Sequence, residues 1–318
     1  MRTRFILGAC LFSVAGAALA QVGAPQLGWI PDGTLIRPVY GIPAAATVGP
    51  AIPMDQDFSR IAASPARNYV LVSAGPASAQ AGVVSVYTPE NGLVPLPGAG
   101  GAPDFLVLSP RGTAAALWFS SINQVQLVTG LPDAPTIRQV DASFLGSTSG
   151  ALALSDDGSW FAGTWPAGAY AFGPNGEVNR LPVENVAALA FLQGTHDLAA
   201  ASAAGVEMIT GVDGFAVVSS LLASADSSLQ PVALAAASGN RTVVLADGSG
   251  SVTAIDVGSG AAATSDCGCQ PEGLFGMGPA AFRLTGLENG AFKIFDAARG
   301  EVLFVPVALA EAAAGAGQ

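Results

Sequence analysis

The fold is decided by three stretches that share one layout: FSRIAASPARNYVLVS (residues 58–73), FLVLSPRGTAAALWFS (residues 105–120) and ALALSDDGSWFAGT (residues 151–164). Each contains a short apolar run, a turn with Ser, Pro, Asp or Gly, and a second apolar run. Runs of about four to seven apolar residues bounded by such turn residues are typical of β-strands. Each stretch therefore predicts a strand, a turn and a second strand.

Three looser copies of this layout begin at Val186, Val232 and Gly273. Second hairpins follow the copies, as in GVVSVYTPENGLVPLP (residues 82–97) and GAFKIFDAARGEVLFVP (residues 290–306). The resulting repeats of four short strands extend from residue 57 to residue 307. Asn-Gly and Asp-Gly pairs, which tolerate the positive φ of tight hairpin turns, begin at Asp32, Asn91, Asp157, Asn175, Asp213, Asp247 and Asn289.

Four short strands in a repeat of about 40–45 residues are typical of one blade of a β-propeller. The sequence therefore predicts an all-β fold of four-stranded antiparallel blades. We favour seven blades, because six repeats are visible and the residues outside them add up to about one further blade, including a hairpin from Leu27. The alternative is a six-bladed ring with this hairpin packed on its edge or one face. In both cases the two ends of the domain are expected to meet, because a closed ring leaves no long unpaired edge.

The chain is expected to contain one domain between two terminal segments. Residues 1–20 combine two arginines, an apolar run and small residues before Gln21, which is the pattern of a secretory signal peptide cleaved after Ala20. Residues 21–308 form the propeller, and residues 309–318, rich in Ala and Gly, are expected to be a disordered tail. No later stretch reaches the ~20 apolar residues of a spanning helix. We therefore expect a secreted or periplasmic protein without a membrane span.

The charge of the chain bears on its partners. Its 318 residues include 12 Lys and Arg against 23 Asp and Glu, a net charge of −11, and Lys293 is the only lysine. Nucleic acid is not an expected partner, because affinity for phosphate backbones depends on clustered Lys and Arg. The acidity is typical of a soluble surface, and attraction of cations or basic ligands is the alternative interpretation.

Two cysteines, Cys267 and Cys269, lie close together in SDCGCQPEG. In an exported protein a disulfide is the first interpretation. Residues two apart on an extended strand lie near the upper limit for bridging, and Gly268 permits the bend that brings them closer. Free structural thiols, or a metal or redox role, are the alternatives.

Catalytic motifs are sparse. His196 is the only histidine, so motifs with two histidine metal ligands are excluded and one candidate general base is left. It falls in the turn between the first two strands of a repeat, where we expect a solvent-exposed side chain. The sequence contains no G-x-S-x-G elbow, no P-loop and no EF-hand spacing.

Polar residues stand immediately before, or at the start of, the first strand of each repeat. That strand is the innermost strand of a propeller blade, so these residues are expected at the entrance of the central channel. Carboxylates and amides that converge on one axis could hold Ca²⁺ or a polar ligand. The alternative is that they only satisfy the turns that begin the strands. The candidates are Asp57, Asp104, Ser149, Glu184, Asn185, Gln230 and Glu272.

The repeats LSPRGTAAALW, LSDDGSWFAGT and VSVYTPENGLVPL resemble those of YVTN and WD40-like propellers, within the group that includes quinoprotein amine dehydrogenase-like domains. The resemblance covers nearly the whole chain after the leader. The Gly-His and Trp-Asp signatures of true WD40 repeats are missing, as is the periodic tryptophan of quinone-binding propellers. The resemblance therefore implies the propeller fold without implying a quinone cofactor.

These observations favour an exported propeller that serves as a binding or scaffold module for a protein or an envelope polymer, with no catalysis and no cofactor. The alternative is an enzyme with a cation-dependent acidic site at the central channel, similar to the lyases or lactonases of the group. Calcium is the cation that such a site would select.

Overall fold

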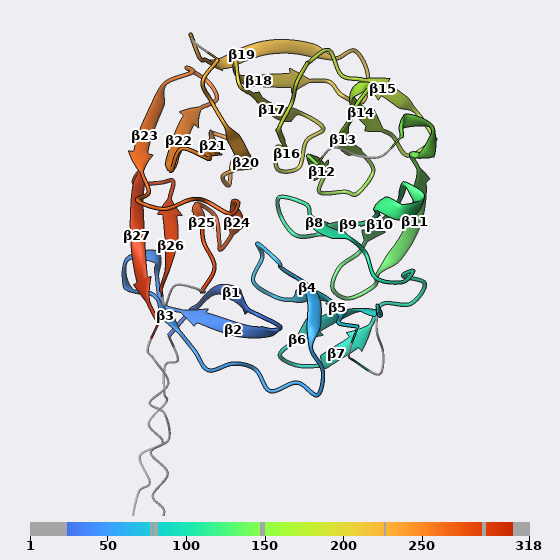
Figure 1. The fold of residues 1–318 in the computed structure, drawn as a ribbon, viewed down its shortest axis with the longest axis vertical. Coiled ribbons are helices and arrows are strands. Elements are labelled where there is room, and N and C mark those ends of the chain that lie inside the picture. Colours follow the sequence, from blue (N-terminus) through green and yellow to red (C-terminus); the bar gives the residue numbers. More distant parts are fainter. Residues whose placement is uncertain are drawn as a thin grey trace, which may run out of the picture.

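In a computed structural model of the chain, the described residues are 24–76, 78, 82–146, 150–225, 227–287 and 291–307. Their strands form seven antiparallel sheets arranged in a ring, a seven-bladed β-propeller (Figure 1). This confirms the predicted fold class and the favoured blade number. Six sheets have four strands, and the first sheet of the chain has three strands among the described residues. The predicted leader and tail lie outside the described residues.

The blades follow one another in chain order. The first four contain β1 (Gln26–Asp32), β2 (Leu35–Tyr40), β3 (Thr47–Val48); β4 (Phe58–Ala63), β5 (Val70–Ala74), β6 (Val84–Thr88), β7 (Gly92–Pro95); β8 (Phe105–Leu108), β9 (Ala114–Phe119), β10 (Gln124–Thr129), β11 (Thr136–Asp141); and β12 (Leu152–Leu154), β13 (Phe161–Trp165), β14 (Gly168–Phe172), β15 (Val178–Arg180). The last three contain β16 (Ala188–Phe191), β17 (Leu198–Ser202), β18 (Gly205–Thr210), β19 (Val217–Ala223); β20 (Pro231–Ala236), β21 (Thr242–Asp247), β22 (Ser251–Asp256), β23 (Ala262–Asp266); and β24 (Phe275–Gly276), β25 (Ala281–Arg283), β26 (Ala291–Asp296), β27 (Glu301–Pro306). The described part of the chain also contains three short 3₁₀ helices, η1 (Pro43–Ala45), η2 (Ser120–Ile122) and η3 (Ser143–Leu145).

Each four-stranded blade places its strands from the channel outward in the order of the sequence (Figure 1). In the four-stranded blades the second strands are buried along nearly their whole length, and β9, with the sequence AAALWF, is buried at every position. A continuous apolar run is typical of a strand that is covered on both faces, and here the neighbouring blades provide that cover. The outer strands are more exposed, as in β19.

The apolar core is divided among the contacts between blades. Trp118, Phe161 and Trp165 belong to one cluster that joins the blade β8–β11 to the blade β12–β15. The rings of Trp118 and Trp165 meet edge to face with their centroids 6.4 Å apart. Such a pair contributes about 0.5–1.5 kcal/mol beyond its buried area. Blade-to-blade packing therefore stabilises the ring.

The ring closes where the first blade packs on the last. Leu27 and Ile30 of β1 share a cluster with Phe292 and Ile294 of β26. The outer strand β27 also contacts β3. The described ends of the domain thus meet, as a closed ring requires. Among the described residues, no helix is long and apolar enough to cross a membrane.

Candidate functional sites

The channel-mouth candidates lie at the starts of innermost strands. Asp57, Asp104 and Gln230 directly precede β4, β8 and β20, respectively. Glu184 and Asn185 lie in the loop before β16, and Glu272 lies in the loop before β24. Ser149 is outside the described residues.

Several of these side chains are bonded within the local turns. Asp104 Oδ2 accepts hydrogen bonds from N and Oγ of Ser120, at 2.7 and 2.6 Å. These bonds lower the pKa of the Asp104 carboxyl. Asp57 Oδ1 accepts a hydrogen bond from Thr34 Oγ1 at 3.0 Å. The carboxylates therefore join the start of an innermost strand to a neighbouring segment.

Glu272 has a similar position, beside a buried cation. Its Oε1 accepts a hydrogen bond from the backbone N of Gly286 at 2.8 Å, and its Oε2 lies 3.9 Å from Nη1 of Arg283. Arg283 is only 5% exposed, and its guanidinium lies 3.9 Å from the ring centroid of Phe275. Burial lowers the pKa of Arg283 to about 10, and the charge of Glu272 opposes this change.

Among the described residues, the candidates are not bonded to one another. Gln230 donates its backbone N–H to Asp247 Oδ2 at 2.7 Å, and Asn185 has a left-handed φ of 52°. In the described part of the chain, no hydrogen bond or ion pair joins one candidate to another, and no group of three His, Cys, Asp or Glu could hold a metal ion. This geometry favours the interpretation that Asp104 and Glu272 accept hydrogen bonds from backbone N–H groups of neighbouring turns.

Cys267 and Cys269 are joined by a disulfide with their Cα atoms 5.1 Å apart. Gly268 between them has a φ of 54°, which provides the bend. The ammonium of Lys293, on β26, donates hydrogen bonds to the carbonyls of Cys267 and Gly268, at 2.6 and 2.7 Å. The only lysine of the chain thus anchors this three-residue loop to the last blade.

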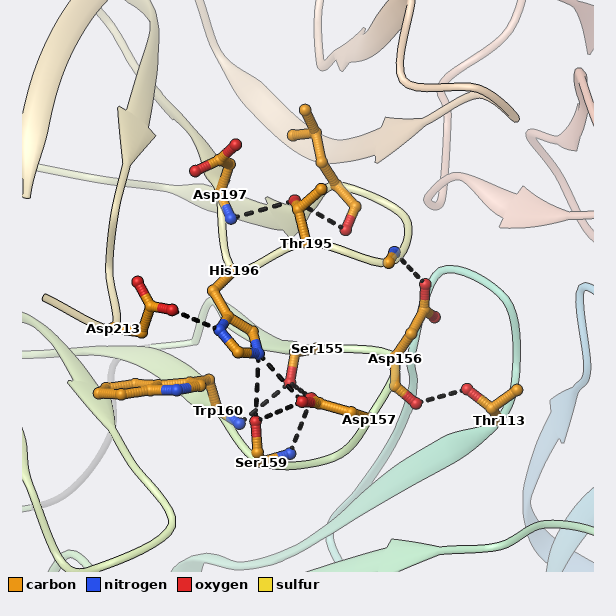
Figure 2. A network of polar contacts seen from close by, with 12 residues as sticks. Thr113, Ser155, Asp156, Asp157, Ser159, Trp160, Thr195, His196, Asp197 and Asp213 are labelled. Carbon is orange, nitrogen blue, oxygen red and sulfur yellow. Dashed lines mark hydrogen bonds and ion pairs between the residues drawn. The ribbon is translucent and has the colours of Figure 1, made fainter.

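His196 lies in the turn between β16 and β17, but the expectation of a solvent-exposed side chain is wrong. The side chain is only 27% exposed. Its Nδ1 lies 2.8 Å from Asp213 Oδ2, and its Nε2 lies 3.0 Å from Asp157 Oδ2 on the preceding blade (Figure 2). Ser159 Oγ also lies 3.2 Å from Nε2. His196 therefore connects two blades.

The hydrogen bonds of this network favour a protonated His196 and an ionised Asp157. Burial acts to lower the pKa of His196, but hydrogen bonds with Asp213 and Asp157 outweigh burial and raise it. Burial likewise acts to raise the pKa of Asp157, but hydrogen bonds from Ser155, Ser159 and His196 bring it well below its usual range. The two carboxylates lie on opposite ring nitrogens, so one metal ion could not bind all three groups. The arrangement acts as an ion-pair bridge between blades.

Asp156, next in the chain to Asp157, extends the bridge to a third blade. Its side chain, seen beside Asp157 in Figure 2, is 8% exposed. Its two oxygens accept hydrogen bonds from the backbone N of Arg111 and of Gly194, both at 2.7 Å. Gly194 has a φ of 66°, and a Cβ there would lie 3.0 Å from the Arg111 guanidinium. The SDDG turn was visible in the sequence, but its partners come from repeats about 40 residues away on either side.

Other turns of this kind are also bonded to their neighbours around the ring. These bonds run from Arg67 Nη1 to Gln26 O, from Tyr69 Oη to Gly112 O, from Asn240 Nδ2 to Gln193 O and from Ser238 N to Pro279 O. Together with Asp156 and His196, they bind successive blades to one another. We call these contacts the turn ring.

Two surface grooves lie away from the turn ring. The first, of about 500 Å³, lies on the blade β16–β19 and includes Glu184, Asn185 and Glu207 in its lining. The second, of about 530 Å³, lies against β6 and β7 and is lined in part by Tyr87 and Leu93. Two of the sequence candidates, Glu184 and Asn185, thus share a groove, whereas Glu207 could not be singled out from the sequence.

No protein-family model matches the chain, and a search of curated proteins finds no match. Solved structures do resemble it. Apo AztD from Citrobacter koseri aligns with a TM-score of 0.58 and 15% identity over 88% of this chain and 81% of that chain. A second structure of Citrobacter koseri AztD gives a TM-score of 0.56, with 16% identity over 88% and 80%. A chain of the mitotic checkpoint complex gives 0.54, with 11% identity over 96% and 99%. At these identities the likeness shows the shared fold alone.

Proposed function

We propose that this chain is an exported propeller that binds or scaffolds a protein or envelope polymer. The observation that carries the proposal is a closed ring, bound blade to blade, that leaves large aromatic side chains exposed. Phe144, Phe215 and Phe304 are exposed by 63%, 90% and 65%, respectively. Exposed aromatic side chains are enriched where proteins bind partners.

The comparisons support a binding role at the level of the fold. The chain of the mitotic checkpoint complex, which aligns over nearly its whole length, is part of an assembly by the name of that structure. Fold alone does not determine function. The leader at residues 1–20 supports export, to the periplasm or outside the cell.

The proposal is tested by placing a photoreactive benzoylphenylalanine at Phe144, Phe215 or Phe304 in the exported protein. Illumination in its own compartment is expected to give a defined cross-linked species from at least one position. The matched control is the same amino acid at Glu90, an exposed polar position. Cross-linking that is no stronger at the three aromatic positions than at residue 90 contradicts the proposal.

The cation-dependent alternative has a separate test. Carboxylates at the channel mouth would hold Ca²⁺, so protein purified without chelator is analysed for bound metal. The triple variant Asp57→Ala, Asp104→Ala, Glu272→Ala is then compared with the wild type in calcium titrations. Stoichiometric calcium that is lost in the triple variant would favour the alternative, and unchanged binding profiles would exclude a channel-mouth site.

A further inference from the structure

The outermost strand of each blade has one side that no other described strand pairs with. Such an edge can pair with another chain unless a short length, a proline or a charge prevents it. Among the described blades, all outer strands except one have such protection. β3 and β15 have only two and three residues, and the others carry Pro95 in β7, Arg138 in β11, Asp266 in β23, and Glu301 and Pro306 in β27.

The exception is β19, which lies at the rim of the ring (Figure 1). Its sequence VVSSLLA has seven residues and neither a charge nor a proline. Val217 is 55% exposed, and Phe215, just before the strand, is 90% exposed. Residues 217–220 pair in regular register with β18, and a β-bulge interrupts the pairing beyond them. This regular stretch is an edge open to a further strand.

The 500 Å³ groove begins where this edge ends. Ser220, Leu222 and Ala223 of β19 form part of its lining. Glu184 and Glu207 also line it, and none of the lining residues is Lys or Arg. The groove therefore favours a cationic group.

We propose that an extended segment of a partner protein adds to β19 as a fifth strand and places a Lys or Arg side chain in this groove. The proposal rests on the binding function above and names its site. In strand addition, backbone hydrogen bonds give affinity and pockets for alternate side chains give specificity. An apolar residue of the segment would contact Val217 and Phe215, and the basic residue would lie between Glu184 and Glu207.

The charges favour this occupant over a second copy of the chain. Two copies joined through β19 would pair molecules that each carry a net charge of −11 and an acidic groove at one end of the shared edge. Like charges that face each other across an interface oppose association. A basic segment gains from the same charges.

The test is a selection of random octapeptides, displayed on phage, against the full exported chain at low salt. Selected peptides are synthesised with a fluorescent label, and their affinities are measured by anisotropy. Peptides that bind are expected to lack proline in the paired residues and to contain one Lys or Arg, with affinity that falls as salt rises.

Two pairs of protein variants locate the binding. Val217→Lys places a charge on the open edge, and its matched control is Val94→Lys on the outer strand β7, where the side chain is 48% exposed. Glu184→Gln with Glu207→Gln neutralises the groove, and its control is Glu301→Gln. We expect Val217→Lys to weaken binding by about tenfold or more and the groove pair by about three- to tenfold, with both controls within about twofold. Circular dichroism and melting temperatures establish that each variant is folded.

The outcomes separate this inference from the proposed function. Peptides that bind Val217→Lys as tightly as the wild type would show that β19 is not the site. The proposed function as a binding propeller would still stand. A failure to select any peptide, together with no specific cross-linking at the aromatic positions, would contradict both. Self-association in sedimentation that Val217→Lys abolishes, without peptide binding, would make a second copy the occupant and overturn the basic segment.

Discussion

His196 is held at both ring nitrogens by carboxylates from two blades. A neutral imidazole donates through only one nitrogen, whereas the imidazolium donates through both. The folded chain therefore favours the protonated ring, and the pKa of His196 is raised even though burial opposes the rise. A raised pKa contributes stability that is complete below the unfolded pKa of about 6.5 and is lost as pH rises through the folded pKa.

The variant His196→Gln is expected to be less stable than the wild type by about 0.5–1 kcal/mol near pH 5.5, and by less near pH 9. The pH range in which the bridge stabilises the fold also has a lower limit. The lowered pKa of Asp157 contributes stability that is present above about pH 4 and is lost as the pH falls further. Urea unfolding at the two pH values measures the difference, and the single histidine gives one NMR titration curve. Gln193→Ala in the same turn is the control. A difference that does not change with pH would contradict the bridge.

Asp156 joins three blades through two backbone N–H groups. Replacing it by Ala leaves both donors without their carboxylate, and a hydrogen bond to a charged group contributes about 1.5–3 kcal/mol. We therefore expect Asp156→Ala to lower the free energy of unfolding by about 2–4 kcal/mol. Asp133→Ala, at an exposed position, is the control. Equal stability of the two variants in denaturant titrations would show that the bonds to Asp156 contribute nothing.

At the scale of elements, the loop between β23 and β24 is held by both the disulfide and Lys293. A disulfide that closes so short a loop removes little entropy from the unfolded chain, about 1.6 kcal/mol in the loop-entropy model. The two hydrogen bonds from the Lys293 ammonium to backbone carbonyls therefore contribute a stabilisation comparable to that of the disulfide.

Lys293→Met is expected to destabilise the chain by about 1.5–3 kcal/mol and to speed reduction of the disulfide, because the loop loses its anchor. Denaturant titration measures the first effect, and release of thiols in a mild phosphine reductant measures the second. Lys293→Arg keeps the charge and is the control. Unchanged stability and an unchanged reduction rate in Lys293→Met would show that the carbonyl contacts are not an anchor.

At the scale of the whole molecule, the ring depends on the contact between its first and last blades. Ile30 of β1 is fully buried in that contact, and Ile209 of β18 is fully buried in a contact between blades adjacent in sequence. Truncation of either to Ala is expected to cost about 2–5 kcal/mol. The closing contact joins distant parts of the chain, so its loss also frees both ends of the ring.

Ile30→Ala is therefore expected to increase hydrogen exchange in both the first and the last blade, whereas Ile209→Ala affects its own blade and the blade it contacts. Exchange followed by mass spectrometry on proteolytic fragments distinguishes the two patterns. Equal exchange patterns in the first and last blades of both variants would show that closure is not a separate weak point of the ring.

The sequence by itself determined the propeller fold and favoured seven blades over six. Apolar runs, glycine turns and the length of the repeat are local properties, and each stretch such as residues 105–120 reports its own strands. The extra hairpin from Leu27 and the residues outside the six repeats sufficed to favour a seventh blade. The positions of Asp57, Asp104 and Gln230 before innermost strands also followed from the repeat.

Only the tertiary structure decided what the polar residues contact. Asp156, Asp157 and His196 lie in turns that look ordinary in the sequence, and their partners come from neighbouring blades. The open edge of β19 and its groove likewise depend on which strands are outermost and on the fold bringing Glu184 and Glu207 into the lining of one groove. The physical reason is that strand formation depends on residues near in sequence, whereas charge pairing depends on residues brought together by closure of the ring.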